Sequence, residues 1–301
     1  MITRRDAVRL LTSASVAGLF AARLAPNFSS LAAESPNSKT DPTPPLAPGA
    51  PTSPQRRALI EAFQKKSDGL EKLYEARTFK SDWTMPYRLY RPSATGKLPL
   101  VIYLHGSGGL GDDNLKQLSF GNVFGTRVFL LPENQKNFPC YVIAPQTDRG
   151  WCRYDLTQTE GEAKQLPGLG DGSRVALALV DTLCRELPID PHRIYVTGQS
   201  MGGAGVWNML TNREKFFAAA VPLCGSPSLD DPARSLATPV WCFHGAADQT
   251  VPVSISRDRI AARRKAGGHP LYTEYEAVDH NVWEWAYTEP ELLKWLFAQH
   301  T

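Results

Sequence analysis

Residues 193–205 read RIYVTGQSMGGAG, and this stretch decides which fold the sequence predicts. Residues 194–197 are β-branched or aromatic, which favours a buried strand, and the small residues after the serine can open a helix that packs closely on a sheet. Ser200 lies between them in a G-x-S-x-G pattern, where Gly198 and Gly202 leave room for a sharp strand-to-helix turn. A tight turn without chemistry is the alternative, but the strand before it and the helix after it favour a serine nucleophile.

The rest of the chain alternates between buried apolar runs and segments with helical periodicity. Strands are predicted at residues 87–90, 98–104, 140–145, 193–197, 217–223, 239–243 and 272–277, and helices at 55–71, 173–187, 254–266 and 291–299. Apolar runs that alternate with helices are typical of a parallel sheet covered on both faces. We therefore predict an α/β fold with a mostly parallel central sheet and helices on both of its faces.

A serine hydroxyl is a weak nucleophile at neutral pH, so it needs a base and a third group that orients the base. After a serine motif of this kind, the acid and then the histidine follow along the chain. Asp248 comes directly after the predicted strand 239–243, and we predict that it is the acid. Asp279 is its rival, but it is adjacent to the candidate histidine, and neighbouring residues rarely orient each other's side chains. Asp231 lies in a polar, proline-rich loop and is expected to face solvent.

The candidate base is His280, which follows the predicted strand 272–277. It completes the chain order Ser200, Asp248, His280 that this arrangement requires. Two of the other five histidines precede a glycine at a strand end, two lie in polar loops and one is near the terminus. A plain surface-loop role is the alternative for His280, and the chain order favours the base.

The negative oxygen that forms during acyl transfer needs backbone N–H donors. Met201, the residue after the nucleophile, supplies one, and a loop after an early strand supplies the other. Residues 104–109, LHGSGG, form that loop, and we predict Ser107 as the donor with Gly108 as the alternative. A phosphate-binding glycine loop is not predicted, because neither a following Gly-Lys-Ser/Thr nor a dinucleotide-binding spacing is present.

Four segments carry a family resemblance: residues 104–114, 142–146, 190–203 and 243–248. They resemble the α/β-hydrolase superfamily, and within it the bacterial phospholipase/carboxylesterase and prolyl-oligopeptidase-like branch, with its feruloyl-esterase-like, acetylxylan-esterase-like and polyhydroxyalkanoate-depolymerase-like relatives. The resemblance covers roughly residues 97–301. Its motifs are specific for the superfamily and suggestive for the branch. It implies an α/β-hydrolase fold, a triad of Ser200, Asp248 and His280, and an acyl-enzyme mechanism.

Residues and resemblance together lead us to expect a secreted serine hydrolase that cleaves small or polymeric carboxylic esters and uses no metal or organic cofactor. A serine peptidase or acyltransferase with the same triad is one alternative. A non-catalytic binding module on this fold is an alternative of another class, although a broken triad would then be expected. Trp151 and Trp283 are predicted to line the substrate site, with core packing as the alternative. The long polar connection 146–172 is a candidate partial lid.

The N-terminal part of the sequence predicts export. Arg4 and Arg5 precede a short, mildly apolar stretch at residues 10–22 that is shorter than the about 20 residues a membrane-spanning helix needs. This pattern predicts a twin-arginine-type signal peptide at residues 1–33, a partner in the export machinery, and a periplasmic or extracellular location. A chance Arg-Arg pair before a helix of the mature fold is the alternative. A proline-rich disordered linker is predicted at residues 34–54, followed by a single catalytic domain at 55–301.

Composition narrows the remaining function classes. The 301 residues carry a formal net charge of +3 and no long basic run, so nucleic-acid binding is not predicted. The chain has five cysteines and no C-x-x-C pair, which gives no support to a zinc ribbon or thioredoxin-type site. An odd number of cysteines leaves at least one thiol outside any internal disulfide.

Overall fold

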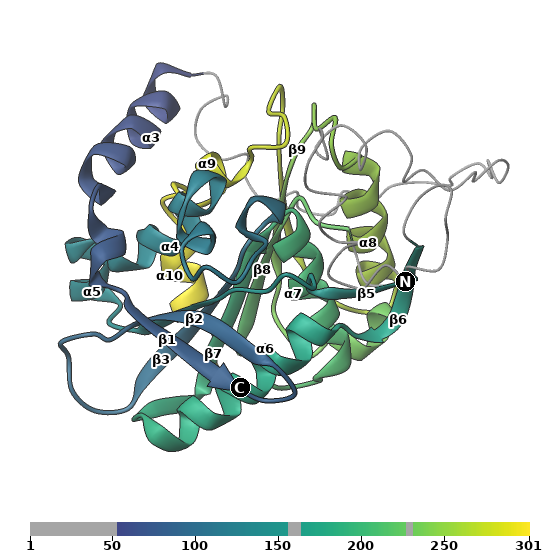
Figure 1. Cartoon of the computed structure of the whole chain (residues 1–301). Helices are drawn as coiled ribbons and strands as arrows, with labels where there is room; N and C mark the ends of the chain where they lie inside the picture. The colour runs from purple at the N-terminus through teal and green to yellow at the C-terminus, as the bar shows by residue number, and fades with distance from the viewer. Residues whose placement is uncertain (1–52, 156–163, 227–230) are drawn as a thin grey trace, which may run out of the picture.

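The computed structural model describes residues 53–155, 164–226 and 231–301 (Figure 1). Within them, an 8-stranded sheet has the order β1-β2-β4-β3-β7-β8-β9-β10. The strands from β4 to β10 in this order run parallel, and β1 and β2 add an antiparallel hairpin at one edge. The strands are Glu75–Lys80 (β1), Thr84–Tyr90 (β2), Leu98–Leu104 (β3), Tyr141–Pro145 (β4), Ile189–Gln199 (β7), Ala219–Leu223 (β8), Trp241–Gly245 (β9) and Leu271–Tyr275 (β10).

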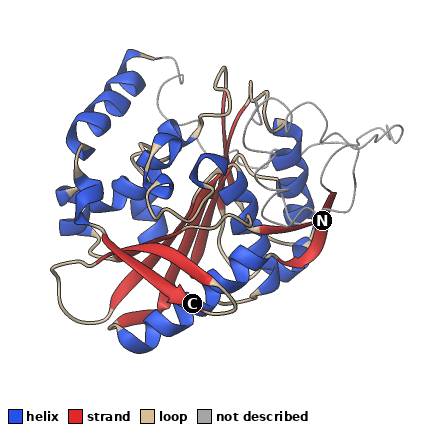
Figure 2. Ribbon diagram, viewed as in Figure 1, coloured by secondary structure: helices blue, strands red, loops and turns tan. Residues whose placement is uncertain are grey.

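Helices cover both faces of the sheet (Figures 1 and 2). Val101 and Tyr103 of β3 belong to one apolar core with α3, α4 and α10, while Leu100 and Ile102 belong to the opposite core with α6, α7 and α8. Neighbouring residues enter opposite cores because side chains alternate across a strand. The helices are Pro54–Ser67 (α3), Val123–Arg127 (α4), Pro132–Asn137 (α5), Asp171–Glu186 (α6), Met201–Asn212 (α7), Val253–Lys265 (α8), Trp283–Ala286 (α9) and Leu292–Phe297 (α10). The predicted α/β fold with a mostly parallel, doubly covered sheet is confirmed.

Helix α3 begins earlier than the sequence predicts. Ser53 caps it by accepting a hydrogen bond from the Arg56 N–H at 3.3 Å, and Pro54 is its first residue. The last two residues of the predicted linker 34–54 thus belong to the start of α3, and the rest of that linker lies outside the described residues. A serine cap followed by proline is a favourable helix start, because proline lacks an N–H that would need a partner there. The buried guanidinium of Arg56 donates to the Trp285 carbonyl at 2.7 Å and lies 3.4 Å from Glu289, which anchors α3 to the domain. Residues 1–52, with the predicted signal peptide, lie outside the described residues.

The connection 146–172 contains two antiparallel strands that the sequence did not predict, β5 (Cys152–Asp155) and β6 (Lys164–Leu169). Its described ends are anchored to the domain. Ser173 donates to the Trp151 carbonyl at 2.7 Å, and Asn208 on α7 accepts from the Gly170 N–H at 3.0 Å. Residues 156–163 lie outside the described residues, so the lid interpretation stays a hypothesis.

Two further features of the described residues bear on the sequence-based expectations. Within ranges 53–155, 164–226 and 231–301, no helix has the length and apolar character needed to cross a bilayer. No disulfide joins the five cysteines, which all lie within the described residues, and each is buried or half-buried.

Candidate active site

Ser200 lies at a sharp turn between β7, which ends at Gln199, and α7, which begins at Met201. Its backbone has φ 54 and ψ −119, a positive-φ conformation that is strained for any residue except glycine. The turn is tight on both sides: a Cβ at Gly198 would lie 2.7 Å from the Leu104 carbonyl oxygen, and a Cβ at Gly202 would collide with the same atom. Glycine at both positions therefore lets the turn lift the serine side chain out of the sheet.

Of the three residues predicted as a triad, Ser200 and Asp248 each lie within hydrogen-bond distance of His280. His280 Nε2 lies 2.8 Å from Ser200 Oγ, and His280 Nδ1 lies 2.8 Å from Asp248 Oδ2. Asp248 follows β9 and His280 follows β10, and both strands run parallel to β7. The carboxyl ends of parallel strands meet at one edge of a sheet. Asp248 and Ser200, which are 32 and 80 positions from His280 in the sequence, therefore come together with it there.

The Asp248 carboxylate is fully enclosed by hydrogen-bond donors. Its Oδ1 accepts the backbone N–H groups of Thr250 and Val251 at 2.8 Å each, and its Oδ2 faces His280 Nδ1 at 2.8 Å and His244 Nε2 at 3.2 Å. Burial alone would raise the pKa of Asp248, but the hydrogen bonds from His244 and His280 outweigh it and hold this pKa well below its usual range. An ionised Asp248 requires a proton on His280 Nδ1, which leaves Nε2 free to accept the serine proton.

The rival acid, Asp279, faces the backbone and not the imidazole. Its Oδ1 accepts the N–H of His280 at 2.7 Å and that of Gln249 at 3.0 Å. These bonds tie together the two loops that carry Asp248 and His280. The geometry thus gives Asp279 a role in loop structure and leaves the ring contact to Asp248.

Both predicted oxyanion donors lie at helix starts beside Ser200. Met201 is the first residue of α7, and Ser107 is the first residue of a short 3₁₀ turn, Ser107–Gly109, that follows β3. The first N–H groups of a helix have no partner within it. Gly106 is excluded as a donor because its N–H donates to Asn122 Oδ1 at 3.0 Å. Ser107 and Gly108 both line the pocket at Ser200, so either remains a candidate for the second donor.

A cavity of about 110 Å³ opens at Ser200 and His280. Gly106, Ser107, Gly108, Gly121, Asn122, Gln199 and Trp283 form the rest of its lining. Trp283 takes part as predicted, with its ring centroid 5.6 Å from that of His280 in an edge-on arrangement. Gly121 and Asn122 were not predicted, because the 3₁₀ turn Phe120–Asn122 carries no motif and reaches the site only through folding. Gln199 lies within the G-x-S-x-G pattern, but no role was predicted for it.

Buried polar groups next to this cavity lining form a hydrogen-bond network. Asn122 Oδ1 lies 3.0 Å from both the Gly106 N–H and the Tyr103 hydroxyl, and the same hydroxyl lies 3.0 Å from Gln199 Oε1. The Tyr103 hydroxyl can donate only one hydrogen bond. Turning the Gln199 amide so that its NH₂ group donates to this hydroxyl lets the hydroxyl donate to Asn122 Oδ1, and all three side chains are then satisfied. The network connects the loop after β3, the loop 120–122 and the residue before the nucleophile.

The prediction that Trp151 lines the substrate site is wrong. Its side chain is completely buried, and its indole N–H donates to the His105 carbonyl at 2.9 Å. Gly205 on α7 provides the space for it, since a Cβ there would lie 2.5 Å from the Trp151 Cβ. Trp151 therefore packs between the sheet and α7, and the glycine that makes this possible is 54 residues away in the sequence.

One cluster in the described residues has the atom types of a metal site. Cys224, Asp248 and His280 each offer one ligand atom, and these atoms lie within 4.8 Å of one another. Burial, and then the nearby Asp248 charge, raise the pKa of the Cys224 thiol well above its usual value. Metals bind the thiolate and not the thiol, and Asp248 and His280 already bond to each other. The donor set therefore fits acyl transfer better than metal binding.

His105, which begins the oxyanion loop, is also buried. Its Nδ1 faces the Gly106 carbonyl at 2.8 Å, and its Nε2 accepts the Thr147 N–H at 3.2 Å, so a single proton on Nδ1 satisfies both contacts. Burial lowers the pKa of His105 to about 4, although the bond to Gly106 opposes this.

This lowered pKa predicts a loss of stability in mild acid. Between pH 6.5 and about 4 the unfolded chain binds a proton at His105 that the folded chain does not, so the free energy of unfolding falls as the pH falls, by up to about 3 kcal/mol in total. Urea unfolding should show the stability difference between wild type and His105→Asn shrinking from pH 7 to pH 4.5. The same substitution at the exposed His192 is the control, and a difference that shrinks equally there would contradict the assignment.

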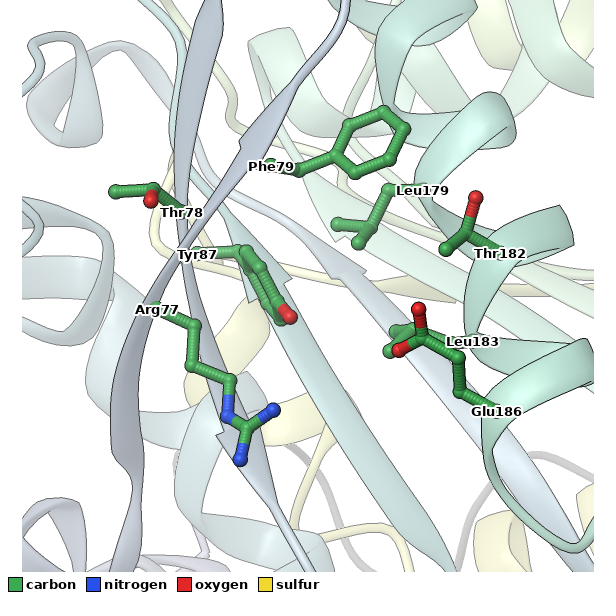
Figure 3. Close-up of a pocket in the computed structure, with 8 residues that line it drawn as sticks. All are labelled: Arg77, Thr78, Phe79, Tyr87, Leu179, Thr182, Leu183 and Glu186. Carbon is green, nitrogen blue, oxygen red and sulfur yellow. The ribbon is translucent and has the colours of Figure 1, made fainter.

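A second cavity of about 290 Å³ lies between the β1–β2 hairpin and α6. Figure 3 shows Tyr87 on β2 facing Leu183 and Glu186 on α6, with Arg77 on the strand side. Its lining also includes Thr78, Phe79, Leu179 and Thr182, and these eight residues include no histidine or cysteine. Ser200 and His280 line the smaller of these two cavities.

Comparison with known proteins places this arrangement in a family. The family model described as phospholipase/carboxylesterase matches residues 92–287, well over half of the chain, and this range includes Ser200, Asp248 and His280. The chain belongs to the phospholipase/carboxylesterase family. The structure of a thermostable esterase is similar to that of this family member, with a TM-score of 0.69 and 32% sequence identity over 77% of this chain and 64% of that chain. The family member thus spans less than two thirds of that esterase's length.

Two further comparisons concern a relative in sequence and a protein that is similar in fold alone. A probable carboxylesterase of Oryza sativa subsp. japonica is 23% identical to the family member over 202 residues, 63% of this chain and 84% of the rice protein. A ferulic acid esterase has a similar fold, with a TM-score of 0.55 at 14% identity over 75% of this chain and 98% of that chain. The resemblance to the α/β-hydrolase superfamily and its phospholipase/carboxylesterase branch is confirmed.

Proposed function

We propose that this phospholipase/carboxylesterase family member hydrolyses carboxylic esters with short acyl groups through an acyl-enzyme on Ser200. The observation that carries the proposal is the unbroken hydrogen-bond chain from Ser200 through His280 to Asp248, which opens into a cavity. His280 accepts the Ser200 proton as Oγ attacks the ester carbonyl, and the N–H groups of Met201 and Ser107 stabilise the oxyanion. The alcohol leaves with the proton from His280, and water then releases the acid by the same steps.

Cavity size supports a short acyl group. Pockets that hold drug-sized ligands have volumes of ~300–1,000 Å³, whereas the cavity at Ser200 has about 110 Å³. Trp283 is its largest side chain, and it packs so closely that a Cβ on Gly121 would lie 2.8 Å from its ring. The acyl group fills this space, and the alcohol part of the substrate stays outside it.

Replacing Trp283 with alanine should therefore shift selectivity toward longer acyl chains. We expect the ratio of kcat/KM for p-nitrophenyl octanoate to that for p-nitrophenyl acetate to rise about tenfold or more, because each accommodated methylene contributes ~1 kcal/mol. Trp285→Ala is the matched control, since Trp285 lies two residues away and is not among the residues that line the cavity. An unchanged ratio in Trp283→Ala would show that another surface binds the acyl chain.

A panel of substrates tests the proposed reaction against its alternatives. We expect a burst of p-nitrophenol equal to the enzyme concentration with activated esters, followed by steady turnover. Faster cleavage of aminoacyl-naphthylamides than of esters would identify a peptidase, and acyl transfer to an added alcohol in preference to water would identify an acyltransferase. An absence of turnover on every substrate would favour the binding module.

We also propose export to the periplasm or the medium, on the basis of Arg4 and Arg5 before the short apolar stretch 10–22. The double change of Arg4→Lys and Arg5→Lys should move most of the protein into the cytoplasmic fraction, because the twin-arginine pathway requires the arginine pair. Immunoblots of fractionated cells measure this. Arg9→Lys, four residues after Arg5 in the sequence, is the control, and equal export of the double variant and the wild type would contradict the proposal.

A further inference from the structure

A second histidine lies against the acid of the proposed triad. His244 is on β9, four residues before Asp248, and its side chain is completely buried. Its Nε2 lies 3.2 Å from Asp248 Oδ2 and 2.9 Å from the Val251 carbonyl oxygen, and its Nδ1 lies 2.7 Å from Ser256 Oγ on α8. His244 is not among the residues that line the cavity at Ser200, so it has no contact with a substrate bound there.

The partners of His244 fix the position of its proton. Two acceptors face Nε2, which therefore carries the hydrogen, and the Ser256 hydroxyl donates to Nδ1. Ser256 Oγ in turn accepts the Cys242 thiol at 3.7 Å, within the range for a sulfur donor. A line of donors thus runs from Cys242 through Ser256 and His244 to Asp248, and every polar atom in it has a partner.

This line gives the Asp248 carboxylate a support that is independent of His280. The two backbone N–H bonds are both on Oδ1, so Oδ2 is held only by the two imidazoles. During the proposed reaction His280 gains and loses a proton twice. A fixed donor on Oδ2 keeps the carboxylate oriented while the His280 ring adjusts, and it helps to keep the carboxylate charged.

We propose that His244 is a positioning residue, which holds the Asp248 carboxylate in the orientation that His280 needs. The inference rests on the proposed function, because it assigns His244 a role through the same Ser200, His280 and Asp248.

The test uses the full chain with p-nitrophenyl acetate and compares two amide variants. His244→Gln places an amide N–H near the position of Nε2, whereas the shorter His244→Asn reaches only the position of Nδ1. We expect His244→Asn to lower kcat about 10-fold to 100-fold, the effect of removing one hydrogen bond to a charged group, with KM nearly unchanged. His244→Gln should recover most of this loss. Tyr275→Phe on the neighbouring strand, which removes another buried hydroxyl, controls for general loosening and should leave kcat close to wild type.

A double-variant cycle then tests whether His244 acts through Asp248. In the Asp248→Ala background, His244→Asn should cause no further loss of kcat, because the carboxylate that it orients is gone. Equal kcat for His244→Asn and wild type, equal loss in the Gln and Asn variants, or additive losses in the double variant would each overturn the inference. Ser200→Ala is assayed beside them: retained activity there would refute the proposed function itself, whereas an inactive Ser200→Ala with an unaffected His244→Asn would refute only the role of His244.

Discussion

If Ser200 is the nucleophile as proposed, replacing it with alanine is expected to lower kcat for p-nitrophenyl acetate by about a million-fold, as removal of a triad nucleophile does in serine hydrolases. The physical reason is that no other hydroxyl is hydrogen-bonded to His280 Nε2 in the described residues. The donors of the oxyanion loop and of Met201 remain, so a residual rate of about 10³-fold to 10⁴-fold over uncatalysed hydrolysis should persist. The burst of p-nitrophenol should vanish, because no acyl-enzyme can form.

Ser119→Ala provides the matched control for this loss. Ser119 is half-buried in the segment that precedes Asn122, and its hydroxyl donates to the Lys116 carbonyl at 3.0 Å. A substitution that removes only this local hydrogen bond should leave turnover close to that of the wild type. A Ser200→Ala variant that folds, by its circular dichroism, and still turns over within tenfold of wild type would remove Ser200 as the nucleophile.

Replacing Asp248 with asparagine is the second large effect, with an expected loss in kcat on the order of 10⁴-fold and a smaller change in KM. Asparagine has nearly the same shape, but its amide can present an N–H to His280 Nδ1. That ring nitrogen must then accept a hydrogen bond, which moves the imidazole proton to Nε2 and removes the acceptor for the serine proton. His244 Nε2 would also lose Asp248 Oδ2, one of the two acceptors that it now faces.

Asp279→Asn separates this effect from a general change of charge near the site. Asp279 bonds through one oxygen to the backbone N–H groups of His280 and Gln249, and asparagine retains one oxygen for these bonds. We therefore expect a loss of no more than about tenfold, the effect of weakening two hydrogen bonds to a charged group. If Asp279→Asn lost more kcat than Asp248→Asn, the choice between the two acids would have to be reversed.

The sequence predicts most of the fold because the pattern of buried runs is local and repeated. The runs around 98–104, 140–145 and 194–197 are buried on both faces, and each is a parallel strand near the middle of the sheet. The strands β1, β5 and β6 were missed because they carry mixed polar and apolar residues. β1 lies at the antiparallel edge of the main sheet, and β5 and β6 form a separate two-stranded sheet. The start of α3 was predicted too late in the sequence, because Ser53 and Pro54 match both a disordered linker and a helix cap.

The residues of the site likewise divide into those that the sequence could predict and those that it could not. Ser200, Asp248 and His280 could be predicted because each follows a strand. In addition, after a serine motif of this kind the acid and then the histidine follow along the chain. Trp151 was placed wrongly because its burial depends on the space above Gly205, which no local pattern encodes. Asn122 was not predicted, because an asparagine between secondary-structure elements has no distinctive neighbours. His244 lies in the segment 243–248 that carries the resemblance, but nothing in the sequence places its side chain against Asp248.

By itself, the sequence determined the strand–turn–helix around Ser200, the alternation that gives a doubly covered parallel sheet, and the candidates for acid and base. These features follow from periodicity and from glycines, whose effects act over a few residues. Only the tertiary structure decided which carboxylate faces His280, which tryptophan lines the cavity, how small that cavity is, and that His244 supports Asp248. Each of these depends on contacts between segments that are far apart along the chain, or on side-chain directions that are set when β9, β10 and α7 pack together.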